Sequence, residues 1–230
     1  MGTDNVEIVL VEAFGLNEFD LKRRVRRSSA QPLTIIRLGT SGGLQKENDV
    51  GTLAISAYAL GLDSTGLFYD QPAADETSLR IEQEAYRIIT EATPRDRRFK
   101  GKIHPYVSKA SPEVVAALKK HAKGKHVVGI TTTASGFFAP QGREIPGLKI
   151  TVPRLQEHLA TLDVDGLKVT NFEMETSLLL HLTRHMGYRS GTICPIIANR
   201  PAGTFLDDYG PAVERAIQTG LNAMLELCRS

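Results

Sequence analysis

The chain has 230 residues, of which 41% are hydrophobic and 23% are charged, enough for a substantial core in one large α/β domain. The formal net charge of +2 gives no strong bias toward nucleic acid or membranes, no segment resembles a basic arm, and no apolar run is long enough to span a bilayer. Cys194 and Cys228 stand in apolar sequence, which predicts buried free thiols and a cytoplasmic location. The six histidines show no metal-ligand spacing, and we expect His181 and His185 on the outer face of a helix.

Strand-like and helix-like segments alternate along the chain. Asp4 and Glu7 have the spacing of a capping box and predict a helix over residues 8–14. The predicted strands are residues 34–38, 52–60, 126–133, 167–170 and 189–198, and further helices are predicted over residues 76–91, 111–123 and 174–185. In the last helix, one apolar stripe is expected to pack on the sheet: Val213, Ile217, Leu221, Met224 and Cys228. This alternation favours an α/β fold with a largely parallel sheet, where ligands bind at the carboxyl ends of strands.

Two segments at predicted strand ends could bind an anion and an aromatic ligand. Residues 37–43 (RLGTSGG) combine an arginine with small residues and hydroxyls that leave backbone N–H groups free. The alternative for this segment is a tight glycine turn with a surface arginine. Residues 133–143 (TASGFFAPQGR) offer aromatic surface, then an amide and a guanidinium two residues apart. The alternative there is a pair of core phenylalanines followed by a polar loop.

Two further segments complete the set. Residues 171–176 (NFEMET) place two carboxylates, Glu173 and Glu175, in an apolar stretch next to a helix start. A carboxylate there could accept two hydroxyl groups of a sugar, or it could cap the helix. Residues 196–200 (IIANR) form the end of a buried strand that emerges into Asn199 and Arg200.

In this order, the four segments resemble those of the nucleoside phosphorylase family and, within it, the uridine phosphorylases. The resemblance runs from Gly2 to the final helix. It implies one domain over residues 1–230 with a three-layer α/β/α fold and a central mixed, largely parallel sheet. It also implies phosphorolysis of uridine, and of deoxyuridine, to uracil and a pentose 1-phosphate in pyrimidine salvage. Phosphate is then a co-substrate, no cofactor or metal is needed, and the protein is a homo-oligomer, a dimer or a hexamer.

The resemblance assigns roles on the phosphate and base sides of the site. Arg37 and Thr40 match phosphate ligands, and Thr40 also lies near the sugar. Phe137 matches the ring that packs on the nucleoside. Gln141 and Arg143 match the pair that binds the uracil edge, and this Gln-x-Arg spacing separates pyrimidine from purine enzymes.

On the sugar side, Glu175 matches the carboxylate that holds the ribose 2′- and 3′-hydroxyls, and Met174 lines the sugar face. Glu173 receives a weaker role. Arg200 matches a residue that assists near the base.

The sequence also departs from the family pattern. The N-terminal strands of the family and their Gly-Asp-Pro-x-Arg phosphate loop have no counterpart in this sequence, so we expect a weakened phosphate site. A non-catalytic nucleoside-binding or storage protein is therefore one alternative. A purine phosphorylase or nucleosidase is another, but Asn199 stands where the purine branch has a proton-donating aspartate, and this disfavours it.

Overall fold

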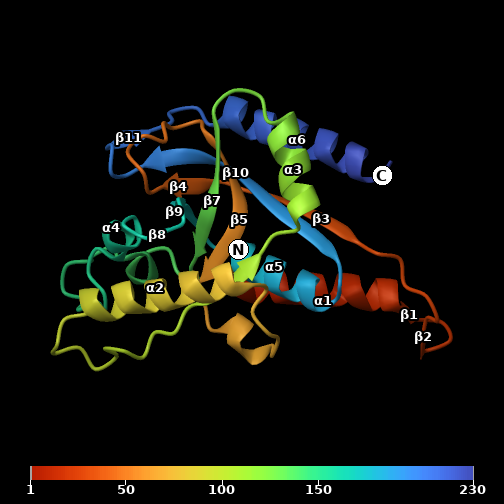
Figure 1. Cartoon of the computed structure of the whole chain (residues 1–230), viewed down its shortest axis with the longest axis horizontal. Coiled ribbons are helices and arrows are strands. Elements are labelled where there is room, and N and C mark those ends of the chain that lie inside the picture. The colour runs from red at the N-terminus through yellow and green to blue at the C-terminus, as the bar shows by residue number, and fades with distance from the viewer. Residues whose placement is uncertain (1, 230) are drawn as a thin grey trace.

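The structure, a computed structural model, describes residues 2–229 and has a mixed α/β architecture (Figure 1). The α-helices of this part are α1 (Thr3–Glu18), α2 (Glu76–Ala92), α3 (Pro112–His121), α4 (Leu155–Leu159), α5 (Thr176–His185) and α6 (Gly210–Leu227). The strands are β1 (Phe19–Asp20), β2 (Val25–Arg26), β3 (Thr34–Leu38), β4 (Ser41–Gly43), β5 (Leu53–Gly61), β6 (Tyr106–Lys109), β7 (His126–Thr133), β8 (Asp163–Val164), β9 (Leu167–Glu173), β10 (Arg189–Asn199) and β11 (Thr204–Phe205). Two short 3-10 helices, η1 (Thr65–Phe68) and η2 (Ala139–Gln141), lie in connections.

The central sheet is mixed and closes on itself. Its strands follow the order β11-β10-β4-β9-β7-β5-β6, and β10 also pairs with β5, so five strands form a small closed ring. The longest ladder, β5 with β7, is parallel, as are β7 with β9, and β10 with β3 and β4. The pairs β4–β9 and β5–β10 are antiparallel, which lets two parallel groups join. The predicted mixed, largely parallel sheet is confirmed, and the ring closure is an addition to it.

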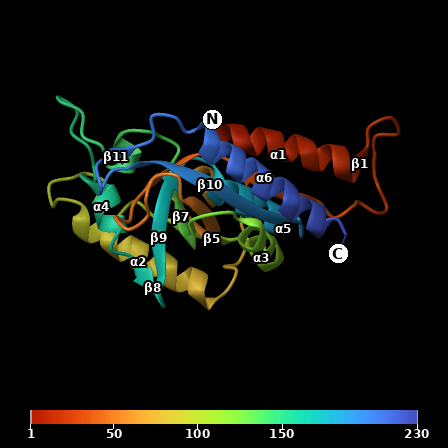
Figure 2. The ribbon, with the colours of Figure 1, turned by 90° about the horizontal axis from the view of Figure 1, so that it is seen from above.

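Helices cover the sheet on both sides. α2 and α4 pack on a cluster around Leu60, Ile130 and Leu159, and α3 and α6 pack on a second cluster around Ile55 and Ile193. Figure 1 shows the strands between these two helix groups, and Figure 2 shows α2 and α1 on opposite sides of the strands. α1 lies against α5 through a third apolar cluster. In the described part of the chain, no helix is long and apolar enough to cross a membrane.

Several predicted boundaries need correction. The first helix begins at Thr3, so Asp4 lies inside its first turn and is no N-cap. β9 continues to Glu173, and α5 begins only at Thr176, so the carboxylate segment is a strand end rather than part of a helix.

Three predicted surfaces also differ. His181 is buried, with its Nε2 2.9 Å from the Tyr69 carbonyl oxygen, because α5 is covered on that face by the segment around η1. Cys228 is exposed, whereas Cys194 is buried as predicted. On α6, the buried residues are not the predicted stripe but its neighbours, which are small except for the last: Ala212, Ala216, Thr219, Gly220, Ala223 and Leu227.

The β1–β2 hairpin projects beyond the end of α1, away from the sheet, in both views (Figure 1, Figure 2). It contains Lys22, Arg23, Arg24, Arg26 and Arg27, and residues 21–29 are all exposed. The expectation that no segment resembles a basic arm is therefore wrong. A net charge taken over the whole chain conceals this local concentration.

Candidate functional site

One cavity of about 590 Å³ collects all the predicted site residues. Its walls come from α1, the β3–β4 segment, the loop after β7, and the ends of β9 and β10. The predicted residues that line it are Arg37, Thr40, Phe137, Gln141, Arg143, Met174, Glu175 and Arg200. This volume lies within the range of small-molecule binding sites.

The register of β4 explains why segments far apart in sequence meet here. Gly42 lies opposite Phe172 of β9 on one side and opposite Ala198 of β10 on the other. The ends of β9 and β10 are therefore held next to the β3–β4 junction. Thr133, at the end of β7, pairs with Glu173 of β9 and brings the following loop to the same place.

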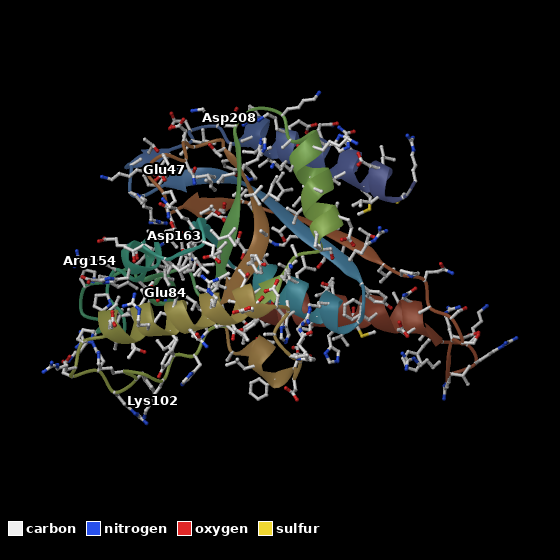
Figure 3. The ribbon with its side chains drawn as sticks, in the orientation of Figure 1. Glu47, Glu84, Lys102, Arg154, Asp163 and Asp208 are labelled. Carbon is white, nitrogen blue, oxygen red and sulfur yellow. The ribbon has the colours of Figure 1, made fainter. Side chains whose placement is uncertain are left out.

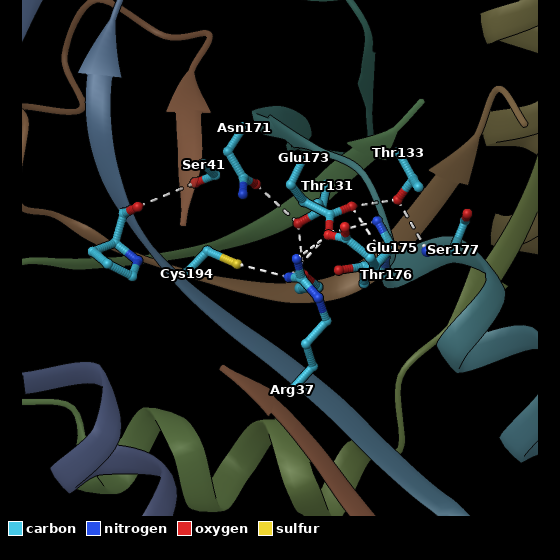
Figure 4. Close-up of polar contacts among 12 residues, drawn as sticks. Arg37, Ser41, Thr131, Thr133, Asn171, Glu173, Glu175, Thr176, Ser177 and Cys194 are labelled. Atoms are coloured by element: carbon cyan, nitrogen blue, oxygen red, sulfur yellow. Dashed lines mark hydrogen bonds and ion pairs between the residues drawn. The ribbon is translucent and has the colours of Figure 1, made fainter. Parts of the chain in front are cut away.

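Arg37 is the centre of the polar part of the cavity (Figure 4). Its Nη1 lies 3.0 Å from Glu173 Oε2 and donates to Cys194 Sγ at 3.1 Å, and its Nη2 donates to Glu175 Oε2 in a short contact. The Arg37 side chain is only 18% exposed, so the interpretation as a surface arginine is wrong. One cation thus stands between two carboxylates at the base of the cavity.

The two carboxylates have different surroundings. Glu173 is almost fully buried and accepts hydrogen bonds from the Glu175 and Thr176 N–H groups at 3.0–3.1 Å, and from the Thr133 hydroxyl. Glu175 stands at the N-cap position of α5, but its side chain caps no N–H group there. The capping alternative therefore applies to Glu173. The side chain of Glu175 reaches the cavity instead.

Burial and neighbouring charges have opposite effects on the pKa values of Arg37 and Cys194. Burial alone would lower the pKa of Arg37, but the negative charges of Glu173 and Glu175 outweigh it and raise that pKa. Burial raises the pKa of the Cys194 thiol to about 11, although the Arg37 charge opposes this rise. At neutral pH, Cys194 is therefore a thiol that accepts a hydrogen bond from a permanent cation.

The predicted base segment forms a compact cationic wall. Arg143 Nη2 donates to Gln141 Oε1 at 2.8 Å, and its guanidinium lies 3.7 Å from the centre of the Phe137 ring. Phe137 and Phe138 are 52% and 53% exposed, so they are not core residues. A ring at the cavity wall with a cation stacked on it can receive a planar ligand.

Two arginines in this wall lack carboxylate partners. Within residues 2–229, no Asp or Glu lies in ion-pair contact with Arg143 or Arg200, and Arg143 Nε is buried without a hydrogen-bond partner. Burial, then the nearby charge of Arg200, lowers the pKa of Arg143 to about 10. Burial also lowers the pKa of Arg200. This end of the cavity therefore has uncompensated positive charge and unpaired donors available to an anionic or carbonyl-bearing ligand.

Two glycines permit close approaches in these segments. A Cβ at Gly39 would lie 2.5 Å from Arg37 Nη1, so any larger residue there would displace the guanidinium from its present position. Gly142, between Gln141 and Arg143, has φ +74° and would place a Cβ 2.1 Å from the Leu155 N atom. The Gln-Gly-Arg turn is thus packed directly on α4.

Asn199 does not face the cavity. Its Nδ2 donates to the carbonyl oxygens of Gln45 at 2.8 Å and Asn48 at 2.6 Å, and its Oδ1 accepts from the Ala202 N–H at 3.1 Å. Ala198 and Arg200 are the residues of this strand end that line the cavity. Residue 199 therefore contributes no proton-donating side chain to the cavity.

The sequence did not point to the α1 wall of the cavity or to Cys194. Asn5, Val6 and Val9 line the cavity from α1, and only their three- and four-residue spacing could have indicated a common helix face. Cys194 lies opposite Ala54 in an apolar strand, where no sequence signal separates a contact with Arg37 from ordinary core packing. In the described residues, no group of three or more His, Cys, Asp or Glu side chains could hold a metal ion.

Comparisons with known proteins agree with this geometry. Among curated proteins, the chain is 30% identical over 175 residues to a uridine phosphorylase of Thermococcus kodakarensis, which covers 75% of this chain and 50% of that protein. It is 26% identical over 203 residues to the uridine and thymidine phosphorylase of Caenorhabditis elegans, over 88% of this chain and 57% of that protein. The chain thus spans about half the length of the curated relatives it matches.

Solved structures give the same result. A Trypanosoma brucei nucleoside phosphorylase with uridine phosphorylase activity is 32% identical with a TM-score of 0.81, over 98% of this chain and 78% of that one. The uridine phosphorylase of Schistosoma mansoni, at 20% identity and a TM-score of 0.62, covers 100% of this chain and 69% of its own and shares the fold. The family model of the phosphorylase superfamily matches residues 1–227. The chain therefore belongs to the phosphorylase superfamily.

Proposed function

We propose that this chain carries the phosphorolysis of uridine, and of its deoxy analogue, to uracil and a pentose 1-phosphate. One observation carries the proposal: Gln141, Arg143 and Phe137 form a cationic wall with unpaired donors, and this wall lines the same cavity as the Arg37–Glu175 pair. The names of the relatives support the same reaction. As a pentosyltransferase, the protein needs phosphate as co-substrate and no other cofactor.

The charges of the wall suit the leaving group. Breaking the glycosidic bond builds negative charge on the base and positive charge on the sugar. In our proposal Arg143 donates to a uracil carbonyl oxygen, Gln141 reads the adjacent N–H and carbonyl, and Arg200 adds positive charge nearby. Fixed donors placed where charge develops are often the largest catalytic contribution. No side chain is required to protonate uracil, which agrees with Asn199 being bonded to backbone groups away from the cavity.

The carboxylate side suits the sugar and phosphate. We assign Glu175 to the ribose 2′- and 3′-hydroxyls and Met174 to the sugar face. Arg37 and Thr40 are assigned to phosphate, with Thr40 also near the sugar. A nucleoside that bonds to Glu175 weakens the hold of Glu175 on Arg37 and leaves that guanidinium available to phosphate. Positioning of the two substrates then accounts for much of the rate.

We also propose a cytoplasmic homo-oligomer. Both cysteines are free, which suits a reducing compartment. Ile8 and Val11 of α1, three residues apart on one helix face, are each at least half exposed, and such an apolar face favours contact with another copy.

The test follows release of the free base from uridine, cytidine and inosine (uracil, cytosine and hypoxanthine) with phosphate present. We expect uridine to be cleaved and cytidine not, because its amino group would leave Arg143 facing a donor; mismatches of this kind discriminate by about 10⁴-fold. Arg143→Leu should lower uridine turnover by at least about 100-fold, the scale of a lost charge-stabilising donor. Arg98→Leu removes an arginine that stacks on Phe99 outside the cavity and is the matched control.

Equal rates on uridine and cytidine, or faster cleavage of inosine, would overturn the base assignment. Calorimetry of uridine binding distinguishes an active phosphorylase from a protein that binds nucleosides without cleaving them. Uridine binding without any uracil release would identify a non-catalytic nucleoside-binding protein.

A further inference from the structure

The β1–β2 hairpin concentrates positive charge on an exposed projection. Among the nine residues 19–27, five are cationic and one is a carboxylate. The chain as a whole has a net charge of +2, so the remainder of the molecule is net negative. The hairpin extends past the end of α1 and away from the cavity-forming strands (Figure 1, Figure 2).

The hairpin is anchored to the body by Glu18. This carboxylate accepts hydrogen bonds from Arg26 Nη2 at 3.0 Å and from the Tyr188 hydroxyl, and the Arg27 N–H donates to the Glu18 carbonyl oxygen at 2.8 Å. At the turn, Asp20 Oδ1 accepts from the N–H groups of the next residues, 22 and 23, both at 3.0 Å. The projection is therefore a folded element with a fixed attachment.

Most of its cations have no internal partner. Arg26 pairs with Glu18, and Arg23 lies 3.9 Å from Asp20. Within the described chain, no carboxylate lies in ion-pair contact with the other three cations of the hairpin, Lys22, Arg24 and Arg27. Their side chains are exposed and available to an anionic surface.

Apolar side chains are exposed among these cations. Leu21 is 64% exposed, Val25 is 52% exposed and Phe19 is 43% exposed. Single-stranded nucleic acid is usually held by cations together with several aromatic stacking platforms. Cations mixed with aliphatic side chains suit a lipid interface, where the charges meet anionic headgroups and the apolar groups enter the acyl boundary.

We propose that the β1–β2 hairpin docks the protein on an anionic lipid surface. The docking groups are the consecutive cations Lys22, Arg23 and Arg24, together with Leu21, which links them to β1. The attachment is electrostatic and reversible, because a few cations and one or two aliphatic side chains bind far more weakly than a membrane-spanning helix.

The test is sedimentation of the full chain with vesicles of phosphatidylserine and phosphatidylcholine in equal parts, against vesicles of phosphatidylcholine alone. We expect binding only to the anionic vesicles, weakened by added salt. The variant Lys22→Gln/Arg23→Gln/Arg24→Asn should bind on the order of a hundredfold more weakly, since each of the three cations contributes about a factor of five. Asparagine is used at position 24 because it tolerates the φ of +55° found there. Leu21→Ser should bind about tenfold more weakly.

The matched control is Arg95→Gln/Arg98→Gln/Lys102→Gln, which removes three exposed cations from a loop on the other side of the molecule, where Lys102 is seen in Figure 3. It should sediment like the parent, and all variants should keep the thermal transition of the parent. No binding to anionic vesicles, or equal loss in the control, would overturn the proposal. Tighter binding to a poly(U) RNA that Lys22→Gln/Arg23→Gln/Arg24→Asn loses and Leu21→Ser keeps would assign the hairpin to nucleic acid instead.

Discussion

Glu173 and Glu175 both contact Arg37, but they are bonded to different numbers of other groups. Glu173 is buried among the hydroxyl of Thr133, two N–H groups at the start of α5 and the guanidinium. Glu175 is 8% exposed, lines the cavity and meets the guanidinium through Nη2. A residue that closes a buried network and a residue that faces a ligand respond differently to substitution.

Glu173→Gln and Glu175→Ala should therefore separate stability from activity. Glu173→Gln leaves Arg37 paired with Glu175 alone and should lower the free energy of unfolding by about 1–3 kcal/mol, the cost of leaving buried hydrogen-bonding groups unsatisfied. Glu175→Ala removes charge-assisted hydrogen bonds to the sugar, so kcat/KM for uridine should fall by an amount equivalent to about 2–4 kcal/mol of transition-state stabilisation. Its free energy of unfolding should fall by less than that of Glu173→Gln. Urea unfolding and uracil release measure the two. The assignment is wrong if Glu175→Ala keeps kcat/KM within threefold of the parent.

At the scale of elements, α2 has the best-defined start. Asp75 is its N-cap, and its Oδ1 accepts from the Ser78 N–H at 2.8 Å, while Oδ2 accepts from Lys109 at 2.8 Å and Tyr58 at 3.0 Å. Burial alone would raise the pKa of Asp75, but the bond from Lys109 and those from Ser78 and Tyr58 lower it from 3.8 to about 2. One side chain thus joins α2 to β5 and β6.

Acid should weaken this junction in a defined range. Because the folded pKa of Asp75 lies below its unfolded value, its contribution is complete above about pH 4 and is lost as the pH falls toward 2. Asp75→Ala should lower the free energy of unfolding at pH 7 by about 1–2 kcal/mol. Asp75→Asn keeps the cap acceptor and should lose less. Urea midpoints across pH 2–7 test this, and a gap between parent and Asp75→Ala that stays constant across that range would contradict it.

Sequence patterns located most elements but not the face of α6. The strand predictions over residues 34–38 and 126–133 match β3 and β7 to the residue, because β-branched runs there end at clear breaks. On α6, the stripe that runs from Val213 to Cys228 was expected inside. Mainly small residues such as Ala216 and Gly220 are inside instead, because the helix approaches the sheet closely: a Cβ at Gly220 would lie 2.6 Å from Leu38 Cδ2. Hydrophobicity alone does not encode that distance.

For the whole molecule, the resemblance placed all eight predicted residues in one cavity, but it did not give their mutual contacts. Two of these contacts depend on the register of β4 and β10. One is the hydrogen bond from Arg37 to Cys194, and the other is the pair of bonds from Asn199 to the backbone carbonyl groups of residues 45 and 48. The hairpin charge was missed for a different reason. A net charge of +2 is a sum, and a sum cannot report where the charges lie.

Uridine should stabilise the molecule as one unit, since the cavity joins β3, β4, β9, β10 and the loop after β7. At a ligand concentration of a hundred times Kd, binding adds about 2.7 kcal/mol. That corresponds to a rise in Tm of roughly 5–10 °C for a domain of this size. Calorimetry with uridine, and with cytidine as the control, measures it. A second transition that uridine leaves in place would show that the cavity and the rest of the sheet unfold separately.

Closure of the sheet also orders the events of folding. β3 and β4, from the first fifth of the chain, find their parallel partner only in β10, near its end. Such long-range pairings form late, because the loop between the partners must be closed before the contacts compensate for it. During synthesis, Arg37 can contact Cys194 only after the chain has been extended by a further 157 residues, and the strand end at Arg200 follows later still. The cavity is one of the last features that a newly made molecule acquires.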